Sequence, residues 1–348
     1  MSKIIFNIVQ SNVKGGLESV FLDYSDIINS NKDYKIICLT SKNFPHNKEI
    51  ENNNIKRINL DIKGHFDIFA SIKLYFLIKK HQPSLIIGHN GRVFAALNII
   101  KKLFRIKNKT LAISHGGNVK RLLNFDYAIG VASHITQNIK EKDSKIITKT
   151  IYNGIKIEDF KQKTTKKDNL FTFGMMSRLS SEKNIDLAIT AFTNFYQNIN
   201  SSSQLIIAGE GEEKERLLKL CHKFNIENQV QFIGWTSNKE DFFNKIDVFL
   251  QTSIKESFGL SVLESFNYFT PVISSNAKGP KEIITNNKTG FLFDSENQNS
   301  LLEKMKYIYK NFNKGQNIAQ NAHKDLLNKF SYEIMSKNLL NFIKNIRI

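Results

Sequence analysis

The chain has 348 residues, of which 41% are hydrophobic and 24% charged, and it carries a formal net charge of +18. This length is enough for two domains of ordinary size, each with its own hydrophobic core. No run of 18 apolar residues occurs, so we expect no transmembrane helix. Residues 1–6 lead straight into a strand pattern without the features of a signal peptide, and we therefore expect a cytoplasmic protein.

Positive charge is concentrated in the first half of the chain. Residues 1–155 hold 24 of the 50 Lys and Arg residues but only 11 of the 32 Asp and Glu residues. This excess favours an anionic partner, which could be a membrane surface, a lipid-linked phosphate or a nucleic acid. The two cysteines, Cys38 and Cys221, fall in a strand-like and a helical segment and are expected to be reduced, so a disulfide has little support.

Short apolar strands alternate with amphipathic helices through the first half. We expect strands at residues 4–10, 34–40, 85–88, 110–114 and 128–132. We expect helices at residues 17–29, 67–81, 92–104 and 134–141. This alternation predicts an α/β fold with a doubly wound parallel sheet.

The same alternation resumes after a turn at Asn153 and Gly154 and a polar, linker-like segment at residues 161–168. We expect strands at residues 171–176, 204–208, 230–233, 248–253 and 271–274, and helices at residues 185–198, 212–224 and 241–245. Residues 330–348 have helical periodicity. The chain is therefore expected to form two domains, residues 1–155 and 156–329, followed by a helix within 330–348.

The run from Lys255 to Glu264 is the most informative motif. It places Glu256 in a loop after a strand and Glu264 in the helix that follows, up to about 12 Å away at the helical rise per residue. Between them, Gly259 lets the backbone approach a ligand, and free N–H groups at the helix start can bind an anion. The pattern suits an elongated ligand with hydroxyls at both ends and negative charge between them, such as a nucleotide sugar. Alternatively, both carboxylates are solvated charges near a helix start.

Six motifs of the chain, taken together, resemble those of the retaining glycosyltransferases of family 4. The spacing from Glu256 to Glu264 resembles the E-x7-E motif of that family. The other segments are residues 14–18 (like GGxE), 114–116 (like H-D/G), 174–184 (like GRLxxEKG), 208–211 (like GxG) and 232–235 (like FxG). The resemblance implies the GT-B fold, in which two Rossmann-like domains with doubly wound parallel sheets face each other across a cleft.

The resemblance also implies an activity and its partners. A hexose or N-acetylhexosamine would pass from a nucleoside diphosphate sugar to a growing glycan of lipopolysaccharide, capsule or another lipid-linked saccharide. A UDP-sugar is the favoured donor, and a GDP-sugar is the alternative. The first domain would bind the acceptor, the second the donor, and residues 330–348 would cross back to the first domain. Two alternatives stay open: a GT-B nucleotide-sugar 2-epimerase, and a basic nucleic-acid-binding protein. Against the latter, the sequence contains no recognised nucleic-acid-binding module, so we expect no nucleic acid partner.

Catalytic roles follow from the resemblance for four side chains, and the chemistry of each suits its role. Arg178 and Lys183 would stabilise the charge that develops on the leaving diphosphate. Glu256 would accept hydrogen bonds from sugar hydroxyls, and His115 would contact a sugar hydroxyl or the reacting centre. Outside this set, Glu264 would accept hydrogen bonds from the ribose. Taken singly, each of these residues also fits an ordinary surface or structural role.

Further positions line the implied site. Those on the donor side are Gly15, Gly16, Gly209, Gly211, Gly234, Trp235, Ser257, Phe258, Gly259 and Leu260. His89 and Asn90 follow an expected strand and would line the acceptor side. Three places depart from the family pattern. Gly116 and Asn184 stand where Asp and Gly are frequent, and residues 279–282 carry an extra charge where a GGxPE-like loop is usual.

No cluster of side chains has the spacing of metal ligands, and residues 61–67 contain no D-x-D motif. We therefore expect catalysis without a metal or another cofactor, with Arg178 and Lys183 in the role of the cation.

The segment from Arg92 to Lys109 combines an apolar stripe with basic residues. The stripe consists of Phe94, Leu97, Ile100, Leu103 and Phe104. Such a segment can lie on an anionic bilayer, which would make the protein peripheral at the inner face of the plasma membrane. The alternative is a helix that packs on the core and has a solvated end.

Overall fold

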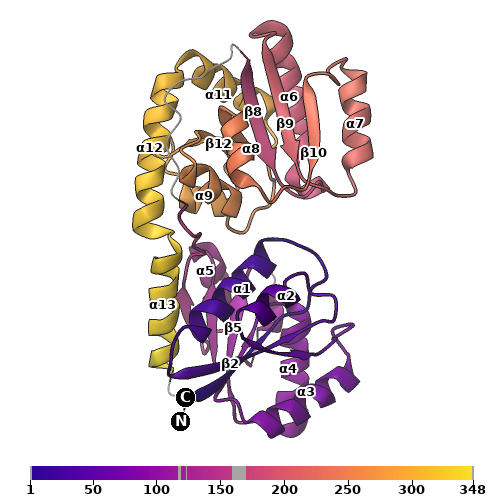
Figure 1. Ribbon diagram of the computed structural model, residues 1–348, viewed down its shortest axis with the longest axis vertical. Helices are drawn as coiled ribbons and strands as arrows, with labels where there is room; N and C mark the ends of the chain where they lie inside the picture. The colour runs from indigo at the N-terminus through magenta and orange to yellow at the C-terminus, as the bar shows by residue number, and fades with distance from the viewer. Residues whose placement is uncertain (1, 117–118, 123, 159–169, 347–348) are drawn as a thin grey trace. The chain divides into compact units, whose positions relative to one another are not determined.

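The computed structural model describes the chain except for residues 1, 117–118, 123, 159–169 and 347–348, and it consists of two compact units (Figure 1). The first unit comprises residues 1–153 and 333–348, and the second comprises residues 154–332. The polar segment 161–168, expected as a linker, lies outside the described residues. Each unit is built on a parallel sheet of its own.

The first unit contains a seven-stranded sheet with the order β3-β2-β1-β4-β5-β6-β7, and every neighbouring pair is parallel. Its strands are β1 (Lys3–Ile8), β2 (Tyr34–Thr40), β3 (Lys56–Asn59), β4 (Leu85–Gly88), β5 (Lys109–Ser114), β6 (Tyr127–Gly130) and β7 (Ile147–Thr150). Its helices are α1 (Gly16–Asn29), α2 (Asn47–Asn52), α3 (Ile68–His81), α4 (Gly91–Phe104), η1 (Val119–Arg121) and α5 (Ser133–Lys142). The central strands are apolar and buried along most of their length, as parallel strands covered on both faces require.

The second unit contains a six-stranded sheet with the order β10-β9-β8-β11-β12-β13, again with parallel pairs throughout. Its strands are β8 (Phe171–Met176), β9 (Ser203–Ala208), β10 (Val230–Gly234), β11 (Val248–Gln251), β12 (Val272–Ser275) and β13 (Phe291–Phe293). Its helices are η2 (Ser181–Lys183), α6 (Ile185–Asn198), α7 (Lys214–Lys223), α8 (Lys239–Lys245), α9 (Leu260–Asn267), α10 (Lys278–Ile283), α11 (Gln298–Lys310) and α12 (Phe312–Lys329). Helices α7 and α12 lie on opposite sides of this unit (Figure 1).

Both sheets reverse their strand order at one point, next to β1 and β4 in the first unit and next to β8 and β11 in the second. In open α/β sheets, loops at the carboxyl ends of the strands beside such a reversal form the usual ligand site. The fold therefore predicts one candidate site in each unit, and both can be built from the loops that follow these strands.

The core of the second unit is rich in phenylalanine. Phe171, Phe173 and Phe195 are buried and contact one another, and the ring centroids of Phe173 and Phe195 lie 5.0 Å apart in an edge-to-face arrangement. Edge-to-face pairs of this kind stabilise a core beyond the area that they bury. These contacts hold the amino-terminal half of β8 in the core, and its carboxyl end leads into the candidate site.

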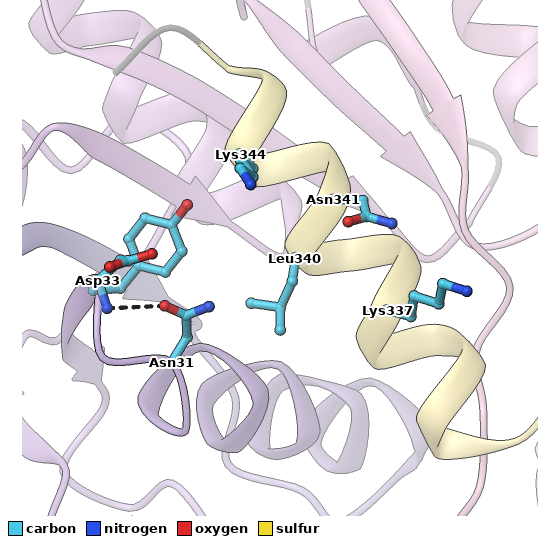
Figure 2. Close-up of a pocket in the computed structure, with 7 residues that line it drawn as sticks. Asn31, Asp33, Lys337, Leu340, Asn341 and Lys344 are labelled. Atoms are coloured by element: carbon cyan, nitrogen blue, oxygen red, sulfur yellow. Dashed lines mark hydrogen bonds between the residues drawn. The ribbon is translucent and has the colours of Figure 1, made fainter.

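Helix α13 (Tyr332–Asn345) lies with the first unit, where the ring of Phe342 packs edge-to-face on Tyr127 at 6.2 Å. Figure 2 shows Lys337, Leu340 and Lys344 of this helix across a hollow from the turn after α1. In that turn the backbone amide of Asp33 donates a 2.9 Å hydrogen bond to Asn31 (Figure 2). Residues 333–348 are thus joined to the first unit although the chain reaches them last.

Most of the apolar stripe on α4 is core. Phe94, Leu97 and Ile100 are buried, whereas Leu103 is 59% exposed at the end of the helix. The core-packing alternative therefore holds for the greater part of this helix. The most exposed aromatic side chains in the described part of the first unit lie instead at and after the start of α3, where Phe66 and Phe69 are almost fully exposed. No helix in the described part of the chain is long and apolar enough to cross a bilayer.

Candidate functional site

In the second unit, the loops after β8 and β11 bring a lysine and a glutamate together. Lys183 Nζ lies 2.8 Å from a carboxylate oxygen of Glu256, and both side chains are only 17% exposed. The residues are 73 positions apart in the chain, and they meet because β8 and β11 are neighbours in the sheet. A partly buried ion pair at the carboxyl edge of a parallel sheet is the central feature of this site.

Two further hydrogen bonds hold these loops against each other. Thr252 Oγ1 donates to the carbonyl oxygen of Lys183 at 2.8 Å, and the amide of Ile254 donates to the carbonyl oxygen of Glu182 at 2.9 Å. The position of Glu256 relative to Lys183 is therefore set by the backbone and does not depend on the ion pair alone.

Arg178 differs from Lys183 in its surroundings. Its side chain is 59% exposed and pairs at 2.9 Å with Glu182, which is itself 44% exposed. Exposed pairs of this kind contribute little to stability, so the guanidinium can change partners at small cost. Arg178 is thus available to an anion that approaches the loop.

Glu264 lies in α9 and is mostly buried, with 13% of its side chain exposed. Its carboxylate pairs with Lys239 Nζ at 2.6 Å. The sequence motif gave no indication of Lys239, which lies at the start of α8 and has no fixed spacing from the glutamate. Both motif glutamates therefore lie opposite a lysine in this structure.

Gly209 and Gly211 allow the turn after β9 to approach the Arg178 loop. A Cβ atom on Gly209 would lie 1.8 Å from the carbonyl oxygen of Ser177, and one on Gly211 would lie 2.2 Å from that of Leu179. Both glycines have positive φ angles, +142° and +157°. The amide of Leu179 also donates to the carbonyl oxygen of Glu210 at 2.8 Å. These glycines thus shape the loop that carries Arg178.

The other glycines of the donor side mark turns. Gly259 has φ +111° and is the N-cap of α9, which begins at Leu260, and no described side chain caps this helix. Gly234 has φ +71°, and its carbonyl oxygen accepts a 2.7 Å hydrogen bond from the amide of Gly209. Asn184 also adopts the left-handed conformation, with φ +51°, which explains how Asn can stand where the family often has Gly.

The remaining donor-side positions divide between core and surface. Phe258 is buried and packs edge-to-face on Phe330 with a centroid distance of 6.1 Å, so its side chain belongs to the core. Trp235 is 54% exposed, and Ser257 lies in the loop between β11 and α9.

In the first unit, α1 begins at Gly16, and Gly15 is its N-cap with an extended backbone (φ −176°) that any residue can adopt. A Cβ atom on Gly15 would lie 3.0 Å from the carboxylate of Glu18, which is itself buried. A larger residue at position 15 would therefore press on the Glu18 carboxylate, whereas the backbone conformation does not require glycine.

His115 follows β5 and contacts His89, which follows β4. His115 Nε2 lies 3.1 Å from His89 Nδ1, and His89 Nε2 lies 2.8 Å from Asn7 Oδ1. His89 is 1% exposed, and both of its ring nitrogens have partners within the first unit. Asn90 caps α4 by accepting from the amide of Val93 and also donates to the carbonyl oxygen of Gln10, which gives it a structural role.

Burial lowers the pKa of both histidines. The pKa of His115 falls to about 4. Burial, together with the nearby His115, holds the pKa of His89 well below its ordinary value. Both rings are therefore uncharged at neutral pH, and His115 is not a cation for a phosphate group there.

Asn7 and Lys239 are the site residues that the sequence motifs do not include. Asn7 interrupts the apolar strand β1, and a buried amide in a central parallel strand is a signal that could have drawn attention to it. In the described part of the chain, no group of three or more His, Cys, Asp or Glu side chains could hold a metal ion.

Residues 156–325 match the family model described as "Glycosyl transferases group 1". Among curated proteins, the chain is 29% identical over 204 residues to the O-antigen biosynthesis glycosyltransferase WclY of Escherichia coli, covering 56% of this chain and 55% of that protein. It is 27% identical over 139 residues to the lipopolysaccharide core biosynthesis glycosyltransferase LpsE of Rhizobium meliloti, covering 40% of this chain and 41% of that protein. The chain thus spans about half the length of these relatives, and it resembles glycosyltransferases of bacterial surface polysaccharides.

Solved structures share the fold over almost the whole chain. Anabaena Alr3699/HepE in complex with UDP and glucose superposes with a TM-score of 0.84 at 20% identity, covering 99% of this chain and 100% of that one. Sucrose-phosphate synthase from Thermosynechococcus elongatus superposes with a TM-score of 0.86 at 16% identity, covering 99% of each chain. The fold is therefore GT-B, as predicted, with two doubly wound α/β units.

Proposed function

We propose that this chain is a retaining glycosyltransferase that takes a sugar from a nucleoside diphosphate donor. The observation that carries the proposal is the partly buried pair of Lys183 and Glu256 at the strand-order reversal of the second unit. This pair lies within the part of the chain that matches the glycosyltransferase family model. A cation for the diphosphate and a carboxylate for sugar hydroxyls are the two groups that such a donor requires.

The ion pair is the arrangement of the free protein, and a bound donor would separate its two side chains. Lys183 would turn from Glu256 to the diphosphate, and the sugar hydroxyls would donate to the carboxylate of Glu256 in place of the lysine. Each group would then exchange one charged or polar partner for another, so neither is left unpaired. The exposed Arg178 would leave Glu182 for the diphosphate, at little cost to the fold.

The leaving diphosphate is where negative charge grows during the reaction. Once Lys183 and Arg178 have turned to the bound diphosphate, they and the N–H groups at the start of α9 would stabilise that charge without further reorganisation. Because these groups act as the cation, we propose that the transfer needs no metal ion. Glu264, further along α9, would accept hydrogen bonds from the ribose after releasing Lys239.

We propose a UDP-sugar of a hexose or N-acetylhexosamine as the donor. The Anabaena protein with this fold was solved with UDP and glucose, which supports UDP-glucose as the first donor to test. The similarity to WclY and LpsE supports a surface glycan as the acceptor.

We further propose that the first unit binds the surface of an anionic membrane, where a lipid-linked acceptor would be found. Phe66 and Phe69 are 89% and 87% exposed at the start of α3, and Phe76 on the same helix is 64% exposed. Exposed lysines, among them Lys79 and Lys80, lie on the same helix. Aromatic rings beside lysines are the composition of an interfacial membrane anchor.

The experiment that tests the transfer uses the full chain, UDP-glucose and UDP-N-acetylglucosamine, and lipid-linked or soluble saccharide acceptors. We expect UDP release that depends on the acceptor, and a product in which the anomeric configuration of the donor is kept. A product of inverted configuration would refute retention. Conversion of the donor sugar to its 2-epimer without an acceptor would identify an epimerase instead.

A further inference from the structure

A chain of hydrogen bonds runs through the core of the first unit and ends at His115. Ser25 Oγ lies 2.8 Å from the carbonyl oxygen of Phe21 and 2.9 Å from Asn7 Nδ2. Asn7 Oδ1 lies 2.8 Å from His89 Nε2, and His89 Nδ1 lies 3.1 Å from His115 Nε2. Asn7 and Ser25 are fully buried and His89 is 1% exposed, so water does not compete for these bonds.

The first links of the chain have only one arrangement of protons. In the structure the hydroxyl of Ser25 donates to the carbonyl oxygen of Phe21, and the NH₂ group of Asn7 also lies 3.5 Å from that oxygen, which can only accept. The oxygen of Ser25 must then accept from the NH₂ group of Asn7. This fixes the orientation of the Asn7 amide, because its other end, the acceptor Oδ1, faces His89.

Cys38 reinforces this arrangement. Its sulfur lies 3.3 Å from Ser25 Oγ, and burial raises the pKa of the Cys38 thiol to about 12. The thiol therefore keeps its proton and donates to the second lone pair of the Ser25 oxygen. The hydroxyl then makes one bond as a donor and two as an acceptor. A reversed Asn7 amide would place its oxygen beside the carbonyl oxygen of Phe21, and neither of these two acceptors could donate to the other.

The remaining links follow from the chemistry of the uncharged imidazole ring, which has one N–H group and one lone pair. His89 must carry its proton on Nε2 to donate to Asn7 Oδ1. Its Nδ1 is then a lone pair, and it can only accept from His115 Nε2. His115 therefore carries its proton on Nε2, and its own lone pair is on Nδ1.

We propose that Asn7 and His89 are positioning residues, which hold His115 with its proton on Nε2 so that Nδ1 accepts a hydrogen bond from a hydroxyl group of a bound sugar. The identity of the ligand rests on the proposed function, whereas the arrangement of protons does not. In this arrangement His115 neither donates a proton from Nδ1 nor carries a charge for a phosphate group. The low pKa of both rings keeps the arrangement in place at neutral pH.

The arrangement can be observed directly by long-range ¹H–¹⁵N correlation spectra of the full ¹⁵N-labelled chain. The signals of His115 are assigned from their loss in His115→Asn, and those of His89 from their loss in His89→Gln. At neutral pH we expect Nε2 of each ring in the protonated range and Nδ1 in the unprotonated range, without titration above about pH 5. Protonation of His115 Nδ1 at neutral pH would overturn the proposal.

The substitution Asn7→Asp tests whether Asn7 sets this arrangement. It replaces the amide by a carboxyl group of almost the same shape, and the carboxylate raises the pKa of His89. One proton taken from solvent then resides on His89 Nδ1, which donates to His115 Nε2, and His115 moves its own proton to Nδ1. We expect His115 Nδ1 to become protonated, and to revert as the pH rises through the raised pKa of His89. Unchanged His115 signals in a folded variant would overturn the proposal.

The matched control is Asn52→Asp, which adds the same carboxyl group at an exposed position of α2 in the same unit. We expect it to leave the His115 signals as they are in the unsubstituted chain. A change in His115 of the same size as in Asn7→Asp would attribute the effect to net charge and overturn the role of Asn7.

Two substitutions of His115 distinguish the role of Nε2, which contacts His89, from the role of Nδ1, which is proposed to contact the sugar. Both are compared in a transfer assay. The amide oxygen of His115→Asn can take the place of the Nδ1 lone pair, whereas His115→Gln keeps only a donor near Nε2. We expect His115→Asn to retain at least about tenfold more kcat/KM than His115→Gln, because the proposal assigns the substrate contact to Nδ1. Greater activity in His115→Gln would overturn that assignment. If the unsubstituted chain transfers no sugar, the proposed function fails, while the spectra still decide the arrangement of protons.

Discussion

Lys183 and Glu256 form a contact of the second unit in which stability and turnover are expected to be linked directly. Each side chain has the other as its charged partner in the free protein and a different part of the donor in the proposed complex. Removing either one therefore has two consequences. It leaves a partly buried charge without its partner, and it removes a group that acts on the donor.

We expect Lys183→Ala and Glu256→Ala each to reduce kcat by two or more orders of magnitude, the size of effect that follows loss of one charge-stabilising group. Each should also lower the free energy of unfolding by about 1–3 kcal/mol, because its former partner stays partly buried. Steady-state kinetics and thermal denaturation measure the two effects separately. In the double variant we expect stability to recover in part while activity does not. Near-normal kcat in both single variants would refute the site.

Removal of metal ions gives a second test at the scale of residues. Because Arg178 and Lys183 are proposed to act in place of a metal cation, dialysis against EDTA should leave the rate of transfer unchanged. The control is Arg178→Ala, which should lower the rate in the same buffer. A loss of activity on chelation that Mg²⁺ or Mn²⁺ restores would refute the metal-independent mechanism.

The sequence motifs place Arg178, Lys183, Glu256 and Glu264 in one unit, and the structure adds their partners. The pairing of Lys183 with Glu256 joins positions 73 apart, and that of His89 with Asn7 joins positions 82 apart. Contacts over such separations depend on the order of strands in the sheet, which local patterns do not contain. For the same reason the sequence gives no sign that His89, expected on the acceptor side, is buried against Asn7 and His115.

At the scale of elements, the central strands of the first sheet follow from their apolar runs and its two edge strands do not. Strands β2 and β4 begin and end where the sequence predicts, at Tyr34–Thr40 and Leu85–Gly88. Strands β3 and β7 lie at the two edges of the first sheet, and their sequences KRIN and ITKT contain no buried residue. An edge strand has a neighbouring strand on one side only, so more of it can face solvent and be polar. Its sequence then lacks the apolar pattern from which a strand is predicted.

The turn after β9 gives a prediction about glycine. In Gly209→Ala or Gly211→Ala the new Cβ atom would lie about 2 Å from a backbone carbonyl oxygen of the Arg178 loop, which cannot move as a side chain can. We expect each change to lower the free energy of unfolding by more than about 2 kcal/mol, and to slow transfer because the loop is displaced. For a unit of this size the melting temperature should fall by roughly 2–4 °C per kcal/mol.

Gly64→Ala is the matched control for these variants. Within the part of the chain that the structure describes, no atom outside residues 63–65 lies within 4 Å of the position that its Cβ would take. We expect its melting temperature and its rate of transfer to equal those of the unsubstituted chain. A Gly209→Ala variant as stable and as active as Gly64→Ala would show that the close approach of the two turns is not required.

At the scale of the whole molecule, charge and exposed aromatic rings occur in the same unit. Residues 1–155 contain most of the excess positive charge, and Phe66, Phe69 and Phe76 belong to this part of the chain. Positive charge attracts a protein to an anionic bilayer, and salt screens this attraction. The free energy gained when aromatic rings enter the bilayer interface is not screened by salt. The two contributions can therefore be separated by salt and by substitution.

We expect the full chain to sediment with vesicles that contain phosphatidylglycerol at low salt, and to bind neutral phosphatidylcholine vesicles much less. Added salt should weaken binding, and Phe66→Ser combined with Phe69→Ser should reduce it further at every salt concentration, since two interfacial rings are lost. Leu218→Ser is the control, because it removes an exposed apolar side chain from the second unit. If the unsubstituted chain stays in solution with anionic vesicles at low salt, the protein has no membrane-binding surface of this kind. If Leu218→Ser weakens binding as much as the phenylalanine changes, the membrane-binding surface is not the one at α3.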